Sequence, residues 1–228
     1  MRDTLPKMED LPGIFPVFPL AGALLLPGGR LPLNIFEPRY LAMVEDALAS
    51  GRMFAMIQSN ERLGTTPHGP ALHGVGCLGR LSSFSETEDG RRYLITLNGL
   101  IRFSVVREVE MQRGYRRVEG DFSRFAADLE QGSAPLLGDR AGLLEALRSY
   151  FDHRGFDADW DSIGAMDDET LVTSLSMVCP FDPIEKQALL EVASLEERAE
   201  TLRTLLRIDL HDWPRDPDDE PPERRMAS

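Results

Sequence analysis

Two spacings of hydrophobic residues divide the chain at about residue 124. Before that point apolar and polar positions alternate, so that Ile101, Phe103 and Val105 share one face while Arg102 and Ser104 lie on the other. A period of two is typical of β-strands with one buried face. We therefore expect Phe103 in the core and Arg102 on the opposite, polar face. From about residue 125 apolar residues recur every third or fourth position, which indicates amphipathic helices.

The first part contains several short runs typical of strands. They cover residues 14–20, 31–36, 53–59, 75–84, 92–98, 100–109 and 115–122. Pro16 and Pro19 lie in the first run, and proline cannot donate a hydrogen bond into a central ladder, so this run is expected to be an edge strand or the first strand. About six antiparallel strands favour a closed or nearly closed small barrel, because closure removes exposed edges.

One helix interrupts these strands early. Glu37 and Pro38 are typical of a helix start, since proline suits the first helical position and an acid suits the positive end. Leu41, Val44 and Leu48 then form one apolar stripe, and Ser50-Gly51 ends it.

The second part has four helical stripes and typical helix starts. Asp168 and Glu169 precede one helix, while Asp182 and Ser194 are each followed three residues later by glutamate, as in a capping box. The first two helices contain the apolar sets Leu143/Leu144/Leu147/Tyr150/Phe151 and Leu171/Leu175/Val178. The stripes of the last two, Ile184/Ala188 and Leu195/Ala199/Leu202/Leu206, are expected to face a common core. These elements predict a small helical bundle.

The predicted organisation is α+β with four segments. Residues 1–11 form a flexible N-terminus, 12–124 an antiparallel β-barrel with one early helix, 125–210 a C-terminal α-helical bundle, and 211–228 a disordered acidic tail. The tail is expected to be disordered because it is rich in proline and charge and too poor in apolar residues to offset the entropy of ordering.

Charge is unevenly spread along the 228 residues. The formal net charge is −13: residues 1–120 carry 14 basic against 13 acidic side chains, and residues 121–228 carry 11 against 25. A field this negative disfavours binding to a phosphate backbone. There is no apolar run of the ~20 residues that a membrane helix needs and no secretory h-region, so we expect a cytoplasmic protein without a membrane partner. Cys77 and Cys179 are expected to stay thiols there.

Catalytic motifs are missing from the sequence. The chain has two lysines, Lys7 and Lys186, and neither lies in a Walker A context or beside a serine that it could activate. No GxSxG elbow occurs, and the four histidines lie in polar or Pro/Gly-rich stretches. The GxGxxG match at 74–79 follows a Pro/His/Gly loop and leads into a strand, so it indicates a bent strand in a hairpin rather than a dinucleotide site.

Two patterns superficially resemble metal sites. His68, His73 and Cys77 lack a fourth ligand, and a strand beginning near Gly74 would carry Cys77 away from the histidines. Asp157, Asp159 and Asp161, with Asp168 in the twelfth position, lack the glycine and glutamate of a calcium loop and indicate a solvated linker. We expect no metal, no cofactor and no enzymatic activity.

Several stretches resemble a known family. They are Pro16-Val17-Phe18-Pro19-Leu20, Leu31-Pro32-Leu33-Asn34-Ile35-Phe36-Glu37-Pro38-Arg39-Tyr40, the Gly76 to Arg80 strand, Leu97-Asn98-Gly99-Leu100-Ile101-Arg102-Phe103, and Glu185-Lys186-Gln187-Ala188-Leu189-Leu190-Glu191. In this order, over residues 12 to 210, the chain resembles the N-terminal, substrate-recognising domain of the ATP-dependent protease Lon.

The resemblance implies a PUA-like β-barrel followed by helices, and a stand-alone version of that domain, because the chain ends before an ATPase or Ser-Lys peptidase module could begin. It also implies a non-catalytic module that recognises unfolded or apolar polypeptide segments, with self-association or a protease as further partners. Such a module would act as an adaptor or regulator in protein quality control.

The residues expected to form a binding surface come from the most specific stretch. Methionine, proline and aromatic side chains suit a surface that accepts varied partners. The candidates are Pro32, Phe36, Glu37, Arg39, Tyr40, Met43 and Met53. The alternative places Phe36 and Tyr40 in the core and makes Glu37 and Arg39 an ion pair that fastens the helix start.

A second function remains open at this point. PUA-like barrels in related folds bind RNA or a modified base, and this barrel contains an arginine-rich set. Its members are Arg91, Arg92, Arg113, Arg116 and Arg117. RNA binding would require them to form one continuous positive face, whereas polypeptide binding would require an apolar groove.

Overall fold

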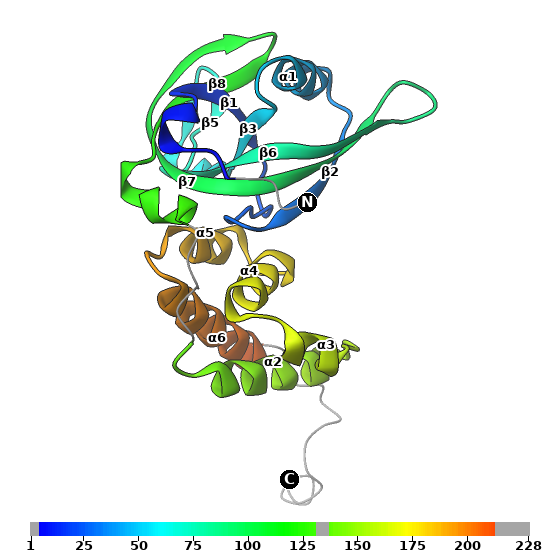
Figure 1. The fold of residues 1–228 in the computed structure, drawn as a ribbon, viewed down its shortest axis with the longest axis vertical. Coiled ribbons are helices and arrows are strands. Elements are labelled where there is room, and N and C mark those ends of the chain that lie inside the picture. Colours follow the sequence, from blue (N-terminus) through cyan, green and yellow to red (C-terminus); the bar gives the residue numbers. More distant parts are fainter. Residues whose placement is uncertain (1–4, 131–136, 213–228) are drawn as a thin grey trace, which may run out of the picture.

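The structure is a computed structural model that describes residues 5–130 and 137–212. A β-barrel lies above a group of helices, and helix α5 (Pro183–Glu191) lies directly beneath the barrel (Figure 1). Most of the tail predicted at 211–228 lies outside the described residues. Near the N-terminus, the described chain forms a short 3-10 turn, η1 (Met8–Asp10).

The barrel is a closed ring of five strands, β1 (Ile14–Pro19), β3 (Met53–Ile57), β6 (Val75–Glu86), β7 (Tyr93–Gln112) and β8 (Tyr115–Asp121). β1 pairs with β3 and β8, β3 with β6, β6 with β7, and β7 with β8, which completes the ring. The α+β fold with an early helix is confirmed. The pairs are antiparallel except β1–β3, because helix α1 (Pro38–Ala49) carries the chain back across the barrel before β3 begins.

Residues 14–19 form the first strand, but the edge position that was the other expectation is wrong. β1 is not an edge strand, since it has neighbours on both sides. Pro16 and Pro19 are tolerated because each is paired on one side: the β8 register covers residues 14–17 and the β3 register covers 17–19. The ring nitrogen of each proline, which has no hydrogen to donate, can therefore face the side of β1 that makes no ladder hydrogen bond at that residue.

β7 is one strand of 20 residues, whereas the sequence suggested two. The strand does not end at Gly99. The backbone of Leu26 packs closely against Gly99, where a Cβ would overlap the Leu26 carbonyl. A β-bulge separates the pairs Leu78–Ile101 and Gly79–Gly99, and it bends the β6–β7 pair. Gly76 and Gly79 likewise leave room for the Phe103 and Leu97 side chains.

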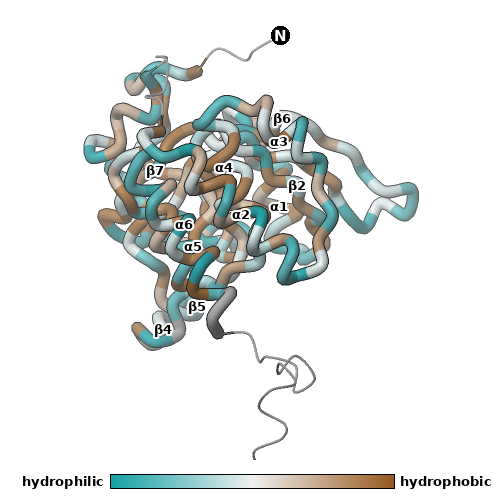
Figure 2. Tube along the Cα trace, turned by 90° about the horizontal axis from the view of Figure 1, so that it is seen from below, coloured by the Kyte–Doolittle hydropathy of each residue, from teal (hydrophilic) through white to brown (hydrophobic). Residues whose placement is uncertain are grey.

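A three-stranded extension of the barrel is called the wing here. It consists of β2 (Arg30–Ile35), residues 93–98 of β7 and residues 82–86 of β6. β2 pairs with β7 alone. The β6–β7 hairpin projects from the barrel, and its tip is hydrophilic (Figures 1 and 2).

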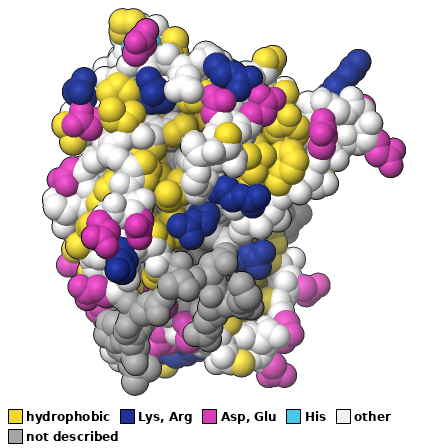
Figure 3. Space-filling view, turned by 45° about the horizontal axis from the view of Figure 1, so that its top comes forward, with side chains coloured by type: hydrophobic (Ala, Val, Ile, Leu, Met, Phe, Trp, Pro, Cys, Tyr) yellow, Lys and Arg dark blue, Asp and Glu magenta, His cyan; other side chains and the backbone are white. Residues whose placement is uncertain are grey.

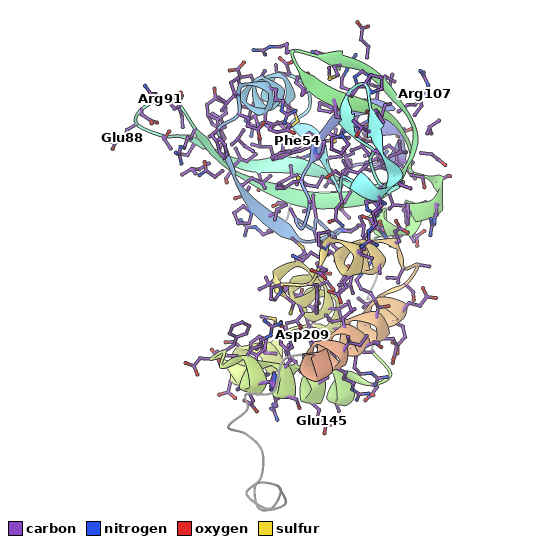
Figure 4. The ribbon with its side chains drawn as sticks, turned by 180° about the vertical axis from the view of Figure 1, so that it is seen from behind. Phe54, Glu88, Arg91, Arg107, Glu145 and Asp209 are labelled. Carbon is purple, nitrogen blue, oxygen red and sulfur yellow. The ribbon has the colours of Figure 1, made fainter. Side chains whose placement is uncertain are left out.

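The core of the barrel is filled by aromatic and aliphatic side chains from every strand. Phe15 and Phe103 meet edge to face at 4.8 Å between ring centroids. Phe54, which points into the barrel in Figure 4, is fully buried. A loop with η2 (Glu61–Leu63), β4 (Thr65–Thr66) and β5 (Gly69–Pro70) joins β3 to β6.

The helical part follows η3 (Ser123–Leu129). It comprises α2 (Arg140–Arg154), α3 (Trp160–Ala165), α4 (Asp168–Val178), α5 and α6 (Leu195–Asp212). Asp182 and Glu185 form the predicted capping box, and Ser194 caps α6 through the Glu197 N–H at 3.1 Å. The prediction that Ile184 and Ala188 face the common core is wrong, since both side chains are exposed.

α5 buries a different face because it lies between the barrel and the other helices. Gln187 donates to the Val75 carbonyl at 3.1 Å, and the Gln58 side chain donates to Gln187 at 3.1 Å and to the Pro183 carbonyl at 2.8 Å. Lys186 donates to the Gly22 carbonyl at 2.8 Å. Polar side chains therefore fill the junction between α5 and the barrel. The pattern of apolar residues did not predict this junction.

The expectation that Arg102 lies on a solvent-facing side of β7 is also wrong. Arg102 is 4% exposed, and its guanidinium pairs with Asp128 of η3 and donates to the Leu190 carbonyl of α5 at 3.1 Å. The strand does alternate, but both of its faces are covered here, one by the barrel core and the other by η3 and α5.

Candidate functional site

The outer face of the wing carries two rows of side chains fixed by strand register. Asn34, Leu94 and Ser85 lie opposite one another in β2, β7 and β6. Pro32, Thr96 and Ser83 form the next row. Because successive residues of a strand point to opposite faces, these six side chains share one surface.

This surface is hollowed. The open hollow has a volume of about 470 Å³, and its lining contains no charged side chain. Pro32, Leu94 and the serine hydroxyls supply apolar contact and adaptable hydrogen bonding. A neutral surface of this kind fits an uncharged segment of polypeptide, since a charged ligand would meet no counter-charge in the hollow.

Phe36 lies two residues after Asn34, just beyond the end of β2. Its side chain is 60% exposed, and the Arg92 guanidinium lies 6.0 Å from its ring centroid. Hydrophobic side chains gather beside the root of the projecting hairpin (Figure 3). The wing thus brings together two predicted binding residues, Pro32 and Phe36, and adds Leu94, which is 48% exposed.

The opposite face of the wing is held against α1. The rings of Phe84 and Tyr93 lie 4.9 Å apart, and the Tyr93 hydroxyl donates to Glu45 of α1 at 3.3 Å. Ile35 and Ile95 are buried on this side. The hollow therefore rests on a packed layer rather than on a free hairpin.

Three further predicted residues offer little or no surface. Tyr40 is 5% exposed, Met43 is fully buried, and Met53 is half-buried at the start of β3. The Tyr40 ring packs 4.2 Å from that of Phe18, and burial raises the pKa of its hydroxyl. Tyr40 and Met43 therefore belong to the barrel core, as the alternative interpretation expected of Tyr40.

The remaining two predicted residues fasten the start of α1. Arg39 Nη2 lies 2.8 Å from Glu37 Oε2, and Arg39 Nε donates to the same oxygen at 3.0 Å. Glu37 is the N-cap residue, but its side chain caps no helix N–H. The pair is half exposed and directly follows Phe36 in the sequence.

Nothing in the hollow supports acid–base or nucleophilic chemistry, because its lining is neutral and untitratable near neutral pH. The thiols lie elsewhere: burial raises the pKa of Cys77, and burial raises the pKa of Cys179 to about 11. Within residues 5–130 and 137–212, no cluster of three metal-ligating side chains is found. Asp159 and Asp167 instead cap α3 and α4 through Ser162 and Thr170.

The arginine set proposed for RNA does not form one free positive face. Arg116 is buried against Glu108 at 2.6 Å, and Arg113 pairs with Glu45 and Asp46, each at 2.7 Å. Arg91 lies at the tip of the projecting β6–β7 hairpin, with Glu88 nearby (Figure 4). Much of the positive charge is therefore matched locally by carboxylates.

Sequence reasoning missed five of the six outer-face side chains that line the hollow: Asn34, Ser83, Ser85, Leu94 and Thr96. The run around Leu94 reads as an ordinary alternating strand, and its sequence does not say which of its two faces remains open. The sequence held one signal for this surface: Pro32, Asn34 and Phe36 are every second residue, so they share one face of an extended strand.

A model of the ATP-dependent protease La (LON) substrate-binding domain matches residues 14–207. The chain belongs to this Lon substrate-binding domain family. The predicted resemblance is confirmed. The match spans both the barrel and the helices, so the wing and the junction with α5 are parts of one family domain.

Curated relatives are full Lon proteases. Lon protease 1 of Sorangium cellulosum is 28% identical over 216 residues, which cover 88% of this chain and 24% of that protein. The Lon protease of Anaeromyxobacter dehalogenans is 26% identical over 102 residues, 45% of this chain and 12% of that protein. The chain thus spans a quarter or less of the length of these two relatives.

Two solved structures share the fold. A Lon N-terminal domain protein from Xanthomonas campestris has a TM-score of 0.59 at 22% identity and is similar over 84% of this chain and 97% of its own. The N-terminal domain of a Mycobacterium avium complex Lon protease has a TM-score of 0.60 at 16% identity, over 85% and 98%. Among the described helices of the present chain, none is long and apolar enough to cross a membrane.

Proposed function

We propose that this Lon-family domain is a non-catalytic module that binds unfolded, uncharged or apolar segments of polypeptide in the hollow of the wing. The observation that carries the proposal is the neutral hollow bordered by exposed Leu94 and Phe36 on a rigid sheet. Membership of a substrate-binding domain family supports the same class of ligand.

The composition of the hollow sets the expected character of binding. An open apolar surface gains affinity from buried area but loses much of it to ordering of the peptide and side chains. Dissociation constants should therefore be about micromolar or weaker. Since the lining carries no charge, salt should change the affinity little.

On this proposal the domain works as an adaptor or regulator in cytoplasmic protein quality control. It would hold a polypeptide segment and present it to a protease or to another copy of the chain. Neither step requires the domain to hydrolyse ATP or a peptide bond, so the purified domain should turn over neither.

Fluorescence anisotropy of labelled, uncharged 12-residue peptides tests the site. Leu94→Asp should weaken binding at least tenfold, because it places a charge in the neutral hollow. Val106→Asp is the matched control, since Val106 is a 57% exposed residue of the same strand outside the hollow. Circular dichroism and melting should show that both variants keep the fold.

Equal loss in the two variants, or binding untouched by Leu94→Asp, would overturn the site. Tight RNA binding that weakens steeply with salt would instead overturn the function, since release of counterions from phosphates causes that dependence.

A further inference from the structure

The hydrogen bonds at the start of β2 establish which of its backbone groups face β7. Gly99 N–H donates to the Gly29 carbonyl at 2.8 Å, and Gly28 N–H donates to the Gly99 carbonyl at 3.0 Å. Gly29 is thus a hydrogen-bonded position opposite Gly99, and the register continues with Arg30 opposite Asn98. Hydrogen-bonded and non-hydrogen-bonded pairs alternate in an antiparallel ladder.

Leu31, Leu33 and Ile35 therefore direct their backbone groups to β7, while the alternate residues direct theirs away from it. The outward groups are the N–H and C=O of Arg30 and Asn34 and the C=O of Pro32. Among the described strands, β2 is the terminal strand of the sheet and pairs only with β7. Within the part of the chain that the structure describes, no hydrogen bond between protein groups engages these outward atoms.

Edge strands are usually blocked by short length, bulges, inward charges or proline. β2 keeps an unbroken six-residue register with β7, and its protection consists of Pro32 and the exposed Arg30. Pro32 removes one donor from the outward row but leaves its carbonyl as an acceptor. The edge thus offers two donors and three acceptors to another backbone.

Beyond Arg30, which is charged and shares the outer face with Pro32 and Asn34, the two faces beside this edge are apolar or neutral. Pro32 and Asn34 border the hollow on the outer face, while the half-buried Leu31 and Leu33 lie on the inner face. A strand added to β2 would place alternate side chains beside each pair. Neither pair offers a charge, so the edge fits a segment with uncharged side chains at successive positions.

We propose that β2 accepts an extended, uncharged segment of a partner polypeptide as an added strand of the wing. This inference rests on the proposed function and states how the segment is held: main-chain hydrogen bonds supply affinity, and the hollow selects alternate side chains. A second copy fits less well. Antiparallel pairing of β2 with itself about Pro32 would place two residues without N–H groups opposite each other.

Backbone methylation of the ligand separates strand addition from side-chain binding. Two versions of one binding peptide are N-methylated at alternate residues, one at odd and the other at even positions. Only one set of N–H groups can face β2, so one version should lose at least tenfold in affinity while the other stays within about threefold of the parent. Equal effects of the two versions would overturn strand addition.

The protein side has its own matched pair of variants. Asn34→Pro removes an outward N–H together with the Asn34 side chain. Asn34→Ala removes the same side chain from the hollow but keeps that N–H, so Asn34→Pro should bind the peptide about five- to tenfold more weakly than Asn34→Ala, as expected for one lost hydrogen bond of about 1 to 1.5 kcal/mol. Equal affinities of these two folded variants would contradict the proposal.

Amide hydrogen exchange of the unmodified protein gives a readout that does not depend on either variant folding. The amides of Arg30 and Asn34 should exchange at least tenfold more slowly with saturating peptide. Peptide binding without this protection and without the methylation asymmetry overturns strand addition and leaves the proposed function standing. Failure of every unmethylated peptide to bind overturns the proposed function, and strand addition with it.

Discussion

Arg102 of β7 and Asp128 of η3 form a buried, bidentate ion pair. Arg102 Nη2 lies 2.7 Å from Asp128 Oδ1 and Nε lies 2.9 Å from Oδ2, while both side chains are more than nine-tenths buried. Arg102 Nη1 also donates to the carbonyls of Leu190 and Val192 at the end of α5. One side chain therefore connects the barrel to the helices and satisfies carbonyls that a helix end leaves unpaired.

Arg102→Ala should lower the free energy of unfolding by about 3 to 5 kcal/mol, because removal of one partner leaves the other charge buried and unpaired. Urea denaturation measures the loss. Arg107→Ala is the control: Arg107 pairs with Glu119 at 2.7 Å, but its side chain is 64% exposed. Exposed pairs contribute about 0 to 1 kcal/mol, so similar losses in the two variants would contradict the role given to burial.

Arg102 also shows where the sequence stops being informative. Alternation correctly separates it from the core residues Ile101 and Phe103, but it cannot show that another element covers the second face. That cover arises from contacts between residues 26 or more positions apart. The same limit explains why Lys186 and Gln187 were not predicted as the buried side of α5.

The candidate site was partly predictable for a related reason. Pro32 and Phe36 were found because they lie in the stretch that carries the family resemblance and are residue types that suit an adaptable binding surface. Tyr40 and Met43 lie on the next element, where helical periodicity alone leaves their orientation open; the helix turns both toward the barrel core. Leu94 joins Pro32 and Phe36 only through the register of β2 with β7.

Phe103→Ala should cost about 3 to 5 kcal/mol, since it removes a fully buried ring and leaves a cavity. The ring contacts Phe15 edge to face and also fills the space above Gly76. Val106→Ala, at a 57% exposed position of the same strand, should change stability by less than about 0.5 kcal/mol. Thermal melts that shift equally would show that the side of β7 facing the core is misassigned.

Arg198 should behave differently from Arg102 although it is also buried. Its Nε donates to the Leu189 carbonyl at 2.9 Å, but Nη2 has no hydrogen-bond partner. Burial, reinforced by the charge of Arg102, lowers the pKa of Arg198 to about 10, so the side chain remains charged at neutral pH.

Arg198→Met replaces that charge with an apolar chain of similar length. Relief of desolvation and of repulsion from Arg102 offsets the lost bond to Leu189, so stability should stay within about 1 kcal/mol of the parent or rise. Urea denaturation beside Arg102→Ala checks this. A loss as large as that of Arg102→Ala would show that Arg198 is an essential part of the junction.

Acid should weaken the attachment between α2 and α4 through Asp168. The Leu137 N–H donates to Asp168 Oδ2 at 2.8 Å, and Arg140 donates to the other carboxylate oxygen. The Leu137 bond is the main cause that lowers the pKa of Asp168; burial opposes it, and Arg140 adds to the lowering. The folded state therefore favours the ionised carboxylate more than the unfolded chain does.

A lowered pKa in the folded state stabilises the protein above the unfolded value of about 3.9, and this contribution disappears as pH falls through the folded value. Asp168→Asn should thus lower Tm by a few degrees at pH 7, and the difference from the parent should shrink steadily below about pH 4. Asp157→Asn, at an exposed position, should leave Tm nearly unchanged across this range. Calorimetry at closely spaced pH values measures the trend, and a Tm difference for Asp168→Asn that stays constant from pH 7 to pH 2 would contradict the role of the ionised carboxylate.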